Sequence, residues 1–162
     1  PEKYSPSMSK LDATDLGILD ILQQDAYSTN KEIADKLNMT TTPVFERVKR
    51  LEREGFIKAY VALLDRHKLG LQLIAFCNVQ LKEHSTVFLQ KFEQDVQSLA
   101  EVQEVYHIAG HYDYLLKVVV ADMSNYQDFV SRKLAALDNI GRVQSSFVMK
   151  ELKHSTRYFL EK

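Results

Sequence analysis

Apolar residues recur at helical spacing through the first third of this 162-residue chain. A first helix is expected to begin after Asp12, which suits the N-cap position. Its inward face consists of Leu11, Asp15, Ile18, Leu19 and Leu22. A shorter helix is expected over Lys31–Leu37, and the break at Asn38-Met39-Thr40 separates it from a longer helix over about Thr40–Glu54. The first third is therefore predicted to hold three helices, the last two joined by a tight turn.

The longer helix separates an apolar face from a charged one. Val44, Val48 and Leu51 recur at steps of four and three, which is the spacing of an inward stripe. Pro43 fits the first turn, where no N–H partner is lost, and Gly55 stands where a helix C-cap favours a left-handed residue. The side chains expected to point outward are Glu46, Arg47, Arg50 and Arg53.

A short helix, a tight turn and a longer helix form the outline of a helix-turn-helix, whose second helix enters the major groove of DNA. The segment Ile57–Asp65 is rich in β-branched and aromatic residues, so a short strand or a wing hairpin is expected there. An amphipathic helical hairpin with a solvated charged face is the alternative. The polar threonine run that opens the longer helix and the strand-like segment that follows it favour DNA binding.

Candidate DNA contacts follow from this outline. Thr41 and Thr42 stand at the N-terminal end of the second helix of the motif, which is the end that usually enters the groove. Arg47 and Arg50 are one turn apart and are placed to reach phosphates or guanine edges. The full set expected to contact DNA is Lys31, Thr41, Thr42, Arg47, Arg50, Arg53 and Lys58.

The hydrophobic pattern changes from helical spacing to alternation near residue 72. The resulting order is βαββαβ, the ferredoxin-like arrangement, in which an antiparallel sheet has helices on one face. Because Tyr112–Ala121 is apolar on both faces, the open face of the sheet is expected to pair with a second copy of the chain. The strands are expected over Gln72–Lys82, Val102–Ala109, Tyr112–Ala121 and Val143–Leu152, and the helices over Thr86–Leu99 and about Tyr126–Leu137.

The change of period divides the chain into two domains and makes it an α+β protein. A polar arm is expected at residues 1–10 and a winged helix-turn-helix domain at residues 11–65. A hinge at residues 66–71 then leads into a ferredoxin-like domain at residues 72–162. A chain of this length accommodates two small domains.

Composition and charge narrow the class of protein. A hydrophobic content of 45% supports a real core, and a net charge of −1 argues against a polybasic binder. A DNA surface must then be a local stripe, multiplied by assembly of several copies. Cys77, the single cysteine, excludes an intrachain disulfide and fits a reducing cytosol. Because no apolar run approaches the roughly 20 residues that span a bilayer and no signal-peptide pattern opens the chain, a cytoplasmic protein without a membrane partner is expected.

Four segments carry a resemblance to a known family. They are LDATDLGILDILQQD from Leu11, TPVFERVKRLEREGFI from Thr42, AGHYDYLLKVVVADMSNYQDF from Ala109 and VMKELKHS from Val148. In this order they resemble the Lrp/AsnC, or feast/famine, family of transcription regulators, above all its leucine-responsive branch. The resemblance implies a nucleoid-associated homodimer that binds double-stranded promoter DNA and often assembles into octamers. It also implies that the C-terminal domain, called the RAM domain, binds a small amino acid at the interface between dimers.

The same resemblance implies an effector site at a turn of the form Gly-x-x-Asp. Here the turn is Gly110-His111-Tyr112-Asp113, followed by Tyr114. A glycine turn lets backbone amides approach a carboxylate, and Asp113 is suited to pair with an α-ammonium group. Met123 is expected to line a hydrophobic pocket, and Ser145 matches a small hydroxyl residue of the family's last strand, whereas Val143 departs from that pattern. Because glycine and aspartate are common in turns, a plain hairpin turn is the alternative.

The leucine-like resemblance and Met123 favour leucine or methionine as the effector. His107 and His111 have the spacing of a metal pair, but no third ligand is evident, so neither a metal nor a cofactor is expected. No nucleophile–base pair and no phosphate loop is recognisable, which argues against an enzyme. The expected function is a transcription regulator that an amino acid tunes, and the alternative is an architectural DNA-compacting protein without an effector response.

Overall fold

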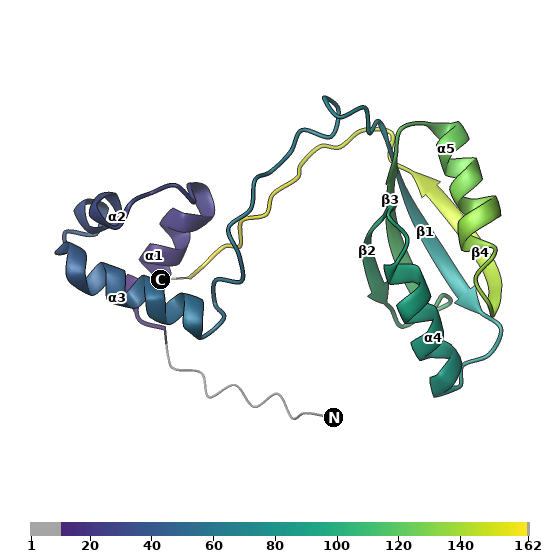
Figure 1. Cartoon of the computed structure of the whole chain (residues 1–162), viewed down its shortest axis with the longest axis horizontal. Coiled ribbons are helices and arrows are strands. Elements are labelled where there is room, and N and C mark those ends of the chain that lie inside the picture. The colour runs from purple at the N-terminus through teal and green to yellow at the C-terminus, as the bar shows by residue number, and fades with distance from the viewer. Residues whose placement is uncertain (1–10, 162) are drawn as a thin grey trace. The chain divides into compact units, whose positions relative to one another are not determined.

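The computed structural model describes residues 11–161, so the expected arm at residues 1–10 lies outside the described residues. The chain divides into two compact units (Figure 1). The first, which we call the helical unit, contains the chain up to Leu63 together with the segment from Lys153 onward. The second, which we call the sheet unit, is Leu64–Leu152.

Three helices form the helical unit: α1 (Ala13–Gln24), α2 (Asn30–Lys36) and α3 (Thr41–Arg53). Capping boxes start the first two, because Asp12 pairs reciprocally with Asp15 and Thr29 with Glu32. The turn between α2 and α3 passes through Asn38, and α3 is followed by Gly55; both residues have a positive φ, as left-handed turn and C-cap positions require.

The core of the helical unit lies between the three helices. The inward stripe expected on the longer helix is confirmed, since Val44, Val48 and Leu51 are all buried. Apolar side chains from α1 and α2 close against it, namely Ile18, Ile33 and Ala34. The spacing of apolar residues therefore suffices to orient the helix-turn-helix.

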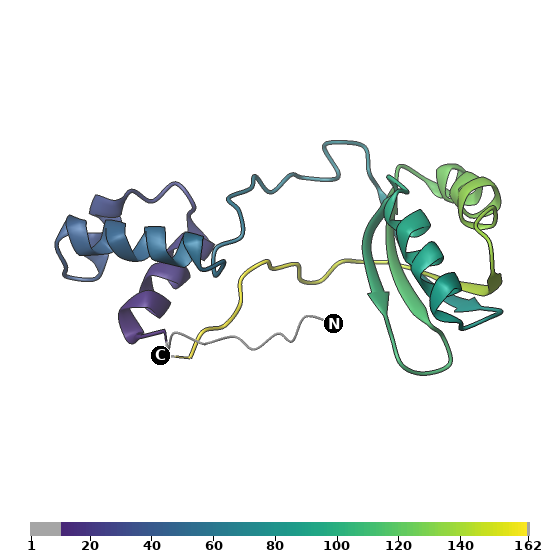
Figure 2. The ribbon, with the colours of Figure 1, turned by 60° about the horizontal axis from the view of Figure 1, so that its bottom comes forward.

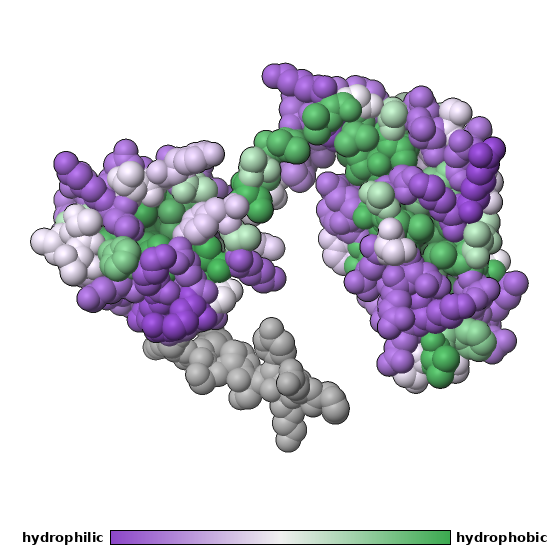
Figure 3. All heavy atoms as spheres, viewed as in Figure 1, coloured by the Kyte–Doolittle hydropathy of each residue, from purple (hydrophilic) through white to green (hydrophobic). Residues whose placement is uncertain are grey.

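The segment after α3 departs from expectation. Ile57–Asp65 forms neither a strand nor a hairpin in the single chain. Ile57 packs against the core of the helical unit, and the apolar side chains that follow it are exposed, including Val61, Leu63 and Leu64 (Figure 3). A strand needs a neighbour to accept its backbone hydrogen bonds, and β-branched composition alone does not supply one.

The C-terminal segment packs against α1 rather than on the sheet. The Arg157 guanidinium lies 2.7 Å from the Asp20 carboxylate, and the Tyr158 backbone N–H donates to Gln23 Oε1 at 2.7 Å. The segment from Lys153 onward therefore belongs to the helical unit, although the sequence placed it with residues 72–162. Because polar contacts hold this segment, its sequence has no apolar periodicity that would predict where it packs.

The sheet unit has the expected order βαββαβ. Its four strands are antiparallel neighbours in the order β2-β3-β1-β4, which confirms the ferredoxin-like topology. Both helical segments cover one face of this sheet (Figures 1 and 2). The elements are β1 (Leu73–Leu81), α4 (Thr86–Gln97), β2 (Val102–His107), β3 (Tyr114–Val120), α5 (Met123–Asp128) continued by the π-helix η1 (Phe129–Leu134), and β4 (Ile140–Phe147).

The last strand is shifted from the range Val143–Leu152 that the sequence predicted. Asn139 turns the chain with a positive φ and donates a side-chain bond to Glu83 O, so pairing begins at Ile140. The strand ends at Phe147, opposite Ala75, and the next backbone N–H, that of Val148, still donates to Ile74 O at 3.0 Å.

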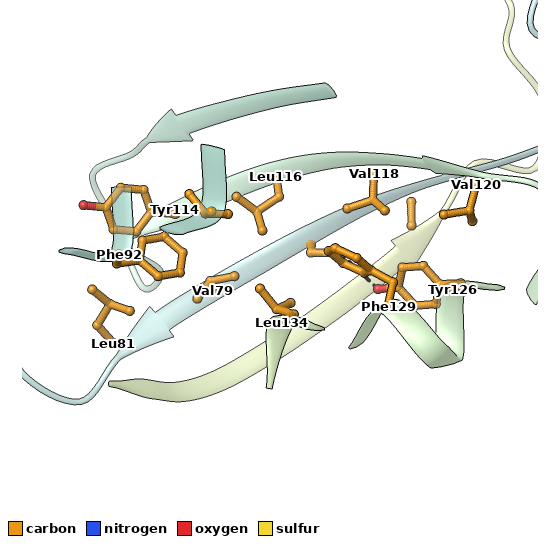
Figure 4. Packing of buried hydrophobic residues seen from close by; sticks show 13 residues of the cluster. Val79, Leu81, Phe92, Tyr114, Leu116, Val118, Val120, Tyr126, Phe129 and Leu134 are labelled. Atoms are coloured by element: carbon orange, nitrogen blue, oxygen red, sulfur yellow. Dashed lines mark hydrogen bonds between the residues drawn. The ribbon is translucent and has the colours of Figure 1, made fainter. Parts of the chain in front are cut away.

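The core of the sheet unit lies between the sheet and its helices. Alternate residues of β3 are buried in it, from Tyr114 to Val120 (Figure 4). Aromatic rings close both ends: Tyr114 packs on Phe92 with ring centroids 4.7 Å apart, and Tyr126 packs on Phe129 with centroids 6.2 Å apart. On the opposite face of the sheet, Phe76, Leu115 and Val119 stay partly exposed.

A small polar cluster is buried at the α5 end of this core. The Tyr126 hydroxyl donates to Ser145 Oγ and lies 3.0 Å from Cys77 Sγ. Burial raises the pKa of the Cys77 thiol, and burial followed by the hydrogen bond with Cys77 raises the pKa of Tyr126. The single cysteine is thus a buried neutral group.

The raised pKa of Tyr126 predicts a loss of stability at alkaline pH. The fold favours the neutral phenol, so its contribution is complete below the ordinary tyrosine pKa of about 10 and declines as the pH rises above it. Urea unfolding at about pH 8 and about pH 11 measures this decline. We expect Tyr126→Phe to destabilise the sheet unit by about 1 kcal/mol at the lower pH and by less at the higher.

Tyr158→Phe is the matched control, because this exposed ring belongs to the helical unit. If wild type and Tyr126→Phe lost the same amount of stability between the two pH values, the alkaline loss would not come from Tyr126.

Candidate DNA interface and effector site

The outer face of α3 presents a row of exposed side chains at helical spacing. Its apolar centre is Phe45, which is 47% exposed, and the Lys49 ammonium lies 6.0 Å from the centroid of that ring. Lys49 also pairs with Glu52 at 2.9 Å. Such a row offers polar, apolar and cationic groups to a groove. The exposed members of the row are Thr41, Thr42, Phe45, Lys49 and Arg53.

The N-terminal end of α3 is open to a partner. Thr40 occupies the N-cap position without a side-chain cap bond, and Thr41 and Thr42 follow it on the surface. Free backbone N–H groups at such an end suit phosphate oxygens. Lys31 and Lys58 are exposed as well, so five of the seven expected DNA contacts, including Arg53, lie on the surface of the helical unit.

The other two, Arg47 and Arg50, do not point outward as the sequence predicted: their side chains turn toward α1 and are 28% and 35% exposed. Arg47 Nη1 donates to Asp12 Oδ2 at 2.6 Å and to Asp15 Oδ1 at 2.8 Å. Arg50 Nη2 lies 2.5 Å from Asp15 Oδ2. Both guanidinium groups therefore reach back from α3 to the first turn of α1.

These contacts shift the pKa values of Asp12 and Arg47. The Asp15 backbone N–H, and then the Arg47 guanidinium, hold the pKa of Asp12 below its ordinary value. The hydrogen bonds to Asp12 and Asp15 raise the pKa of Arg47. The Asp15 side chain is only 1% exposed, and a carboxylate buried in this way requires a cationic partner. The sequence did carry the signal, since Asp15 falls on the inward stripe of the first helix.

The turn between β2 and β3 is the expected effector segment. Gly110 has a φ of +145°, which side chains disfavour, so glycine is required by the backbone there. Asp113 fixes the other end of the turn: its backbone N–H donates to Val79 O at 2.9 Å and its carbonyl accepts from Ile108 N at 2.8 Å. The Asp113 carboxylate in turn accepts from the Leu81 backbone N–H at 2.7 Å.

His84 is a member of this cluster that the sequence analysis did not single out. Its Nε2 lies 3.0 Å from Asp113 Oδ1, while Asp113 Oδ2 faces Leu81. A contact between residues so far apart in the chain leaves no local signal. Each carboxylate oxygen has two lone pairs, so Asp113 keeps capacity for a further donor such as an ammonium group.

The tyrosines of the segment lie in different surroundings. The Tyr112 hydroxyl donates to the Gln144 side chain on β4. Tyr114 is buried on the helix side of the sheet, where its hydroxyl donates to Glu93 at 2.9 Å and its ring stacks on His107. Tyr114 therefore serves the core, and His111 remains on the surface.

The expected effector residues do not form one pocket within a single chain. Met123 follows β3, whereas the turn precedes it, so the length of a seven-residue strand, about 20 Å, separates them. Ser145 points to the helix side of the sheet, where it is bonded to Tyr126. Only the turn, with His84 and Gln144 beside it, is brought together.

The described residues contain neither a membrane-spanning helix nor a metal-binding cluster. No helix among them is long and apolar enough to cross a membrane. No three histidine, cysteine or acidic side chains in the described part of the chain group closely enough to hold a metal ion.

A helix-turn-helix unit joined to a ferredoxin-like unit is the architecture of a DNA-binding regulator that senses a ligand. Residues 11–58 match the family model of winged helix-turn-helix DNA-binding domains, and residues 74–158 match that of the Lrp/AsnC ligand-binding domain. The chain belongs to the Lrp/AsnC family. It is a DNA-binding transcription regulator with an amino-acid-binding domain, and not an enzyme.

Named relatives cover almost the whole chain. It is 39% identical over 151 residues to the DNA-binding transcriptional activator DecR of Escherichia coli, covering 93% of this chain and 99% of that one. It is 38% identical to the leucine-responsive regulatory protein of Klebsiella pneumoniae, covering 93% of this chain and 92% of that protein. A solved transcriptional regulator of Neisseria meningitidis in complex with L-Met is 34% identical, with a TM-score of 0.86 over 90% of this chain and 94% of that chain.

The bonds of Asp113 predict a structural role beside any ligand role. Asp113→Ala leaves the Leu81 N–H without its acceptor, so we expect the sheet unit to lose about 1–3 kcal/mol in urea unfolding. Asp113→Asn keeps an acceptor oxygen in place and is expected to lose less. Equal stability of wild type and Asp113→Ala would show that the carboxylate does not anchor the turn.

Proposed function

We propose that this protein regulates transcription by binding promoter DNA as a homodimer, or as an octamer of such dimers, in response to leucine or methionine. The observation that carries the proposal is the presence of a DNA-binding and a ligand-binding domain in one chain. Acting on chromosomal DNA, it works in the cytoplasm as a nucleoid-associated protein.

The exposed row of α3 supports the DNA half of the proposal. Thr41 and Thr42 supply hydroxyl groups at the helix end that enters the groove, and Arg53 supplies a charge for phosphates. Phe45 adds an apolar contact suited to the methyl group of thymine. Lys31 and Lys58 are the proposed backbone contacts outside α3.

The turn supports the effector half. Gly110 leaves open space around its backbone, and Asp113 has a carboxylate with spare acceptor capacity beside it. An amino acid carries a carboxylate and an ammonium group at the spacing that such a pair can recognise. The L-Met complex of the Neisseria meningitidis regulator, and the leucine-responsive regulatory protein of Klebsiella pneumoniae, favour an apolar amino acid.

Assembly supplies what one chain lacks. Met123 is 44% exposed at the far end of β3, so a site that uses both Met123 and the turn needs more than one copy. The partly exposed apolar side chains on the open face of the sheet favour pairing through that face. A ligand bound between copies shifts assembly, and the spacing of helical units with it.

Selection of bound duplexes from a random-sequence pool tests the DNA half. Wild type is expected to enrich a twofold-symmetric sequence with thymine at a fixed position. Phe45→Ala is expected to lose that thymine preference and about tenfold in affinity, because one base contact contributes roughly 1–3 kcal/mol. Tyr27→Ala, which removes an exposed ring outside α3, is the control. Unchanged selection by Phe45→Ala would remove Phe45 from the interface.

A melting-temperature screen against the twenty amino acids, run beside light scattering, tests the effector half. A ligand at 100 times its dissociation constant adds about 2.7 kcal/mol, which raises the melting temperature by on the order of 10 °C. Asp113→Asn is expected to abolish the shift while keeping DNA binding. Asp128→Asn, at an exposed carboxylate of the same unit, is expected to keep the shift.

Two results would contradict the effector assignment. A full response in Asp113→Asn would mean that the Gly-x-x-Asp segment is only a turn. No response of wild type to any amino acid, with strong and weakly sequence-specific DNA binding, would favour the architectural alternative.

A further inference from the structure

We propose that Asp15 is a positioning residue for DNA recognition. Its buried carboxylate holds Arg47 and Arg50 against α1, so these two arginines set the direction of α3 and leave DNA contact to the exposed row. The inference rests on the proposed function and names the residues that do and do not touch DNA within it.

The geometry uses the whole Asp15 carboxylate. Oδ1 accepts from Arg47 at 2.8 Å and Oδ2 lies 2.5 Å from Arg50, so each oxygen faces one guanidinium. Arg47 also bonds Asp12, the N-cap residue of α1. One acidic turn of α1 therefore binds two successive turns of α3, which fixes both the distance and the rotation between the helices.

Withdrawal of either arginine towards DNA would break this arrangement. The Asp15 side chain is 1% exposed, so the loss of either arginine would leave its buried charge with less compensation. The contact that holds Arg50 is the one from Nη2 to Asp15, since its Nε is buried without a hydrogen-bond partner among the described residues. The two guanidinium groups are thus committed to the protein.

This commitment has a measurable electrostatic consequence. Each cation that neutralises a DNA phosphate steepens the dependence of affinity on salt, whereas a cation already paired in the protein releases few counterions. Arg47 and Arg50 should then contribute little to the salt slope. Arg53, on the same helix and exposed, should contribute fully.

The experiment measures affinity against salt concentration for the duplex that wild type selects from a random-sequence pool. Arg53→Gln is the matched control and is expected to lower the slope of log K against log salt by about one for each protomer contact. Arg47→Gln and Arg50→Gln are expected to keep the wild-type slope and to lose about tenfold in affinity at every salt concentration. The loss must appear at temperatures where circular dichroism shows the variants fully folded.

Melting temperatures separate positioning from stability alone. Asp15→Asn is expected to lower the melting temperature of the helical unit by about 10 °C, and Arg47→Gln added to it should cost little more, because the pair is already broken. Arg47→Lys keeps a charge near Asp15 and is expected to recover part of the affinity. This variant also replaces Arg47→Gln if that protein does not fold.

Three results would overturn the inference. If Arg47→Gln and Arg50→Gln lowered the salt slope as much as Arg53→Gln does, Arg47 and Arg50 would contact phosphates. If the folded variants bound DNA with wild-type affinity, the contacts of Asp15 with Arg47 and Arg50 would stabilise the helical unit without positioning α3 for DNA. If wild type selected no duplex, the proposed function would be wrong and the inference would fail with it. This failure would be seen before any variant is measured.

Discussion

A carboxylate buried between helices must be paired, and this constraint organises the helical unit. Asp15 lies on the inward face of α1 at 1% exposure, where an apolar residue would be usual. Its two arginine partners come from α3, so the helix that carries the exposed row is tied to the start of α1. Hydrophobic contacts bring the three helices together, but they tolerate sliding and rotation that a set of directed ion pairs does not.

The sheet unit is organised by the central position of β1, which pairs with β3 on one side and β4 on the other. This pairing places the Gly110–Asp113 turn beside the end of β1, where the Asp113 carboxylate accepts the Leu81 N–H. The same pairing puts Met123 at the far end of β3. In the proposed function, a ligand that contacts both residues therefore lies between chains.

Periodicity was sufficient to predict both units, the order of their elements and the capping of α1. It failed for Ile57–Asp65, which has strand-like composition but no neighbouring strand, and it placed the start of β4 too late, because the turn at Asn139 lets pairing begin at Ile140. For the site, residue type and spacing singled out the threonines of α3, and the family resemblance singled out the Gly110–Asp113 turn. The expectation that Arg47 and Arg50 point outward was wrong, because a charged residue on a helix was taken to face water. The acidic residue on the inward stripe of α1 was the clue that those charges have a destination within the protein.

The attachment of the C-terminal segment to α1 makes the helical unit discontinuous in sequence, with the whole sheet unit inserted between its two parts. During synthesis the three helices emerge first, yet Asp20 and Gln23 meet their partners only after the sheet unit has left the ribosome. The first unit to begin folding is therefore the last to be completed.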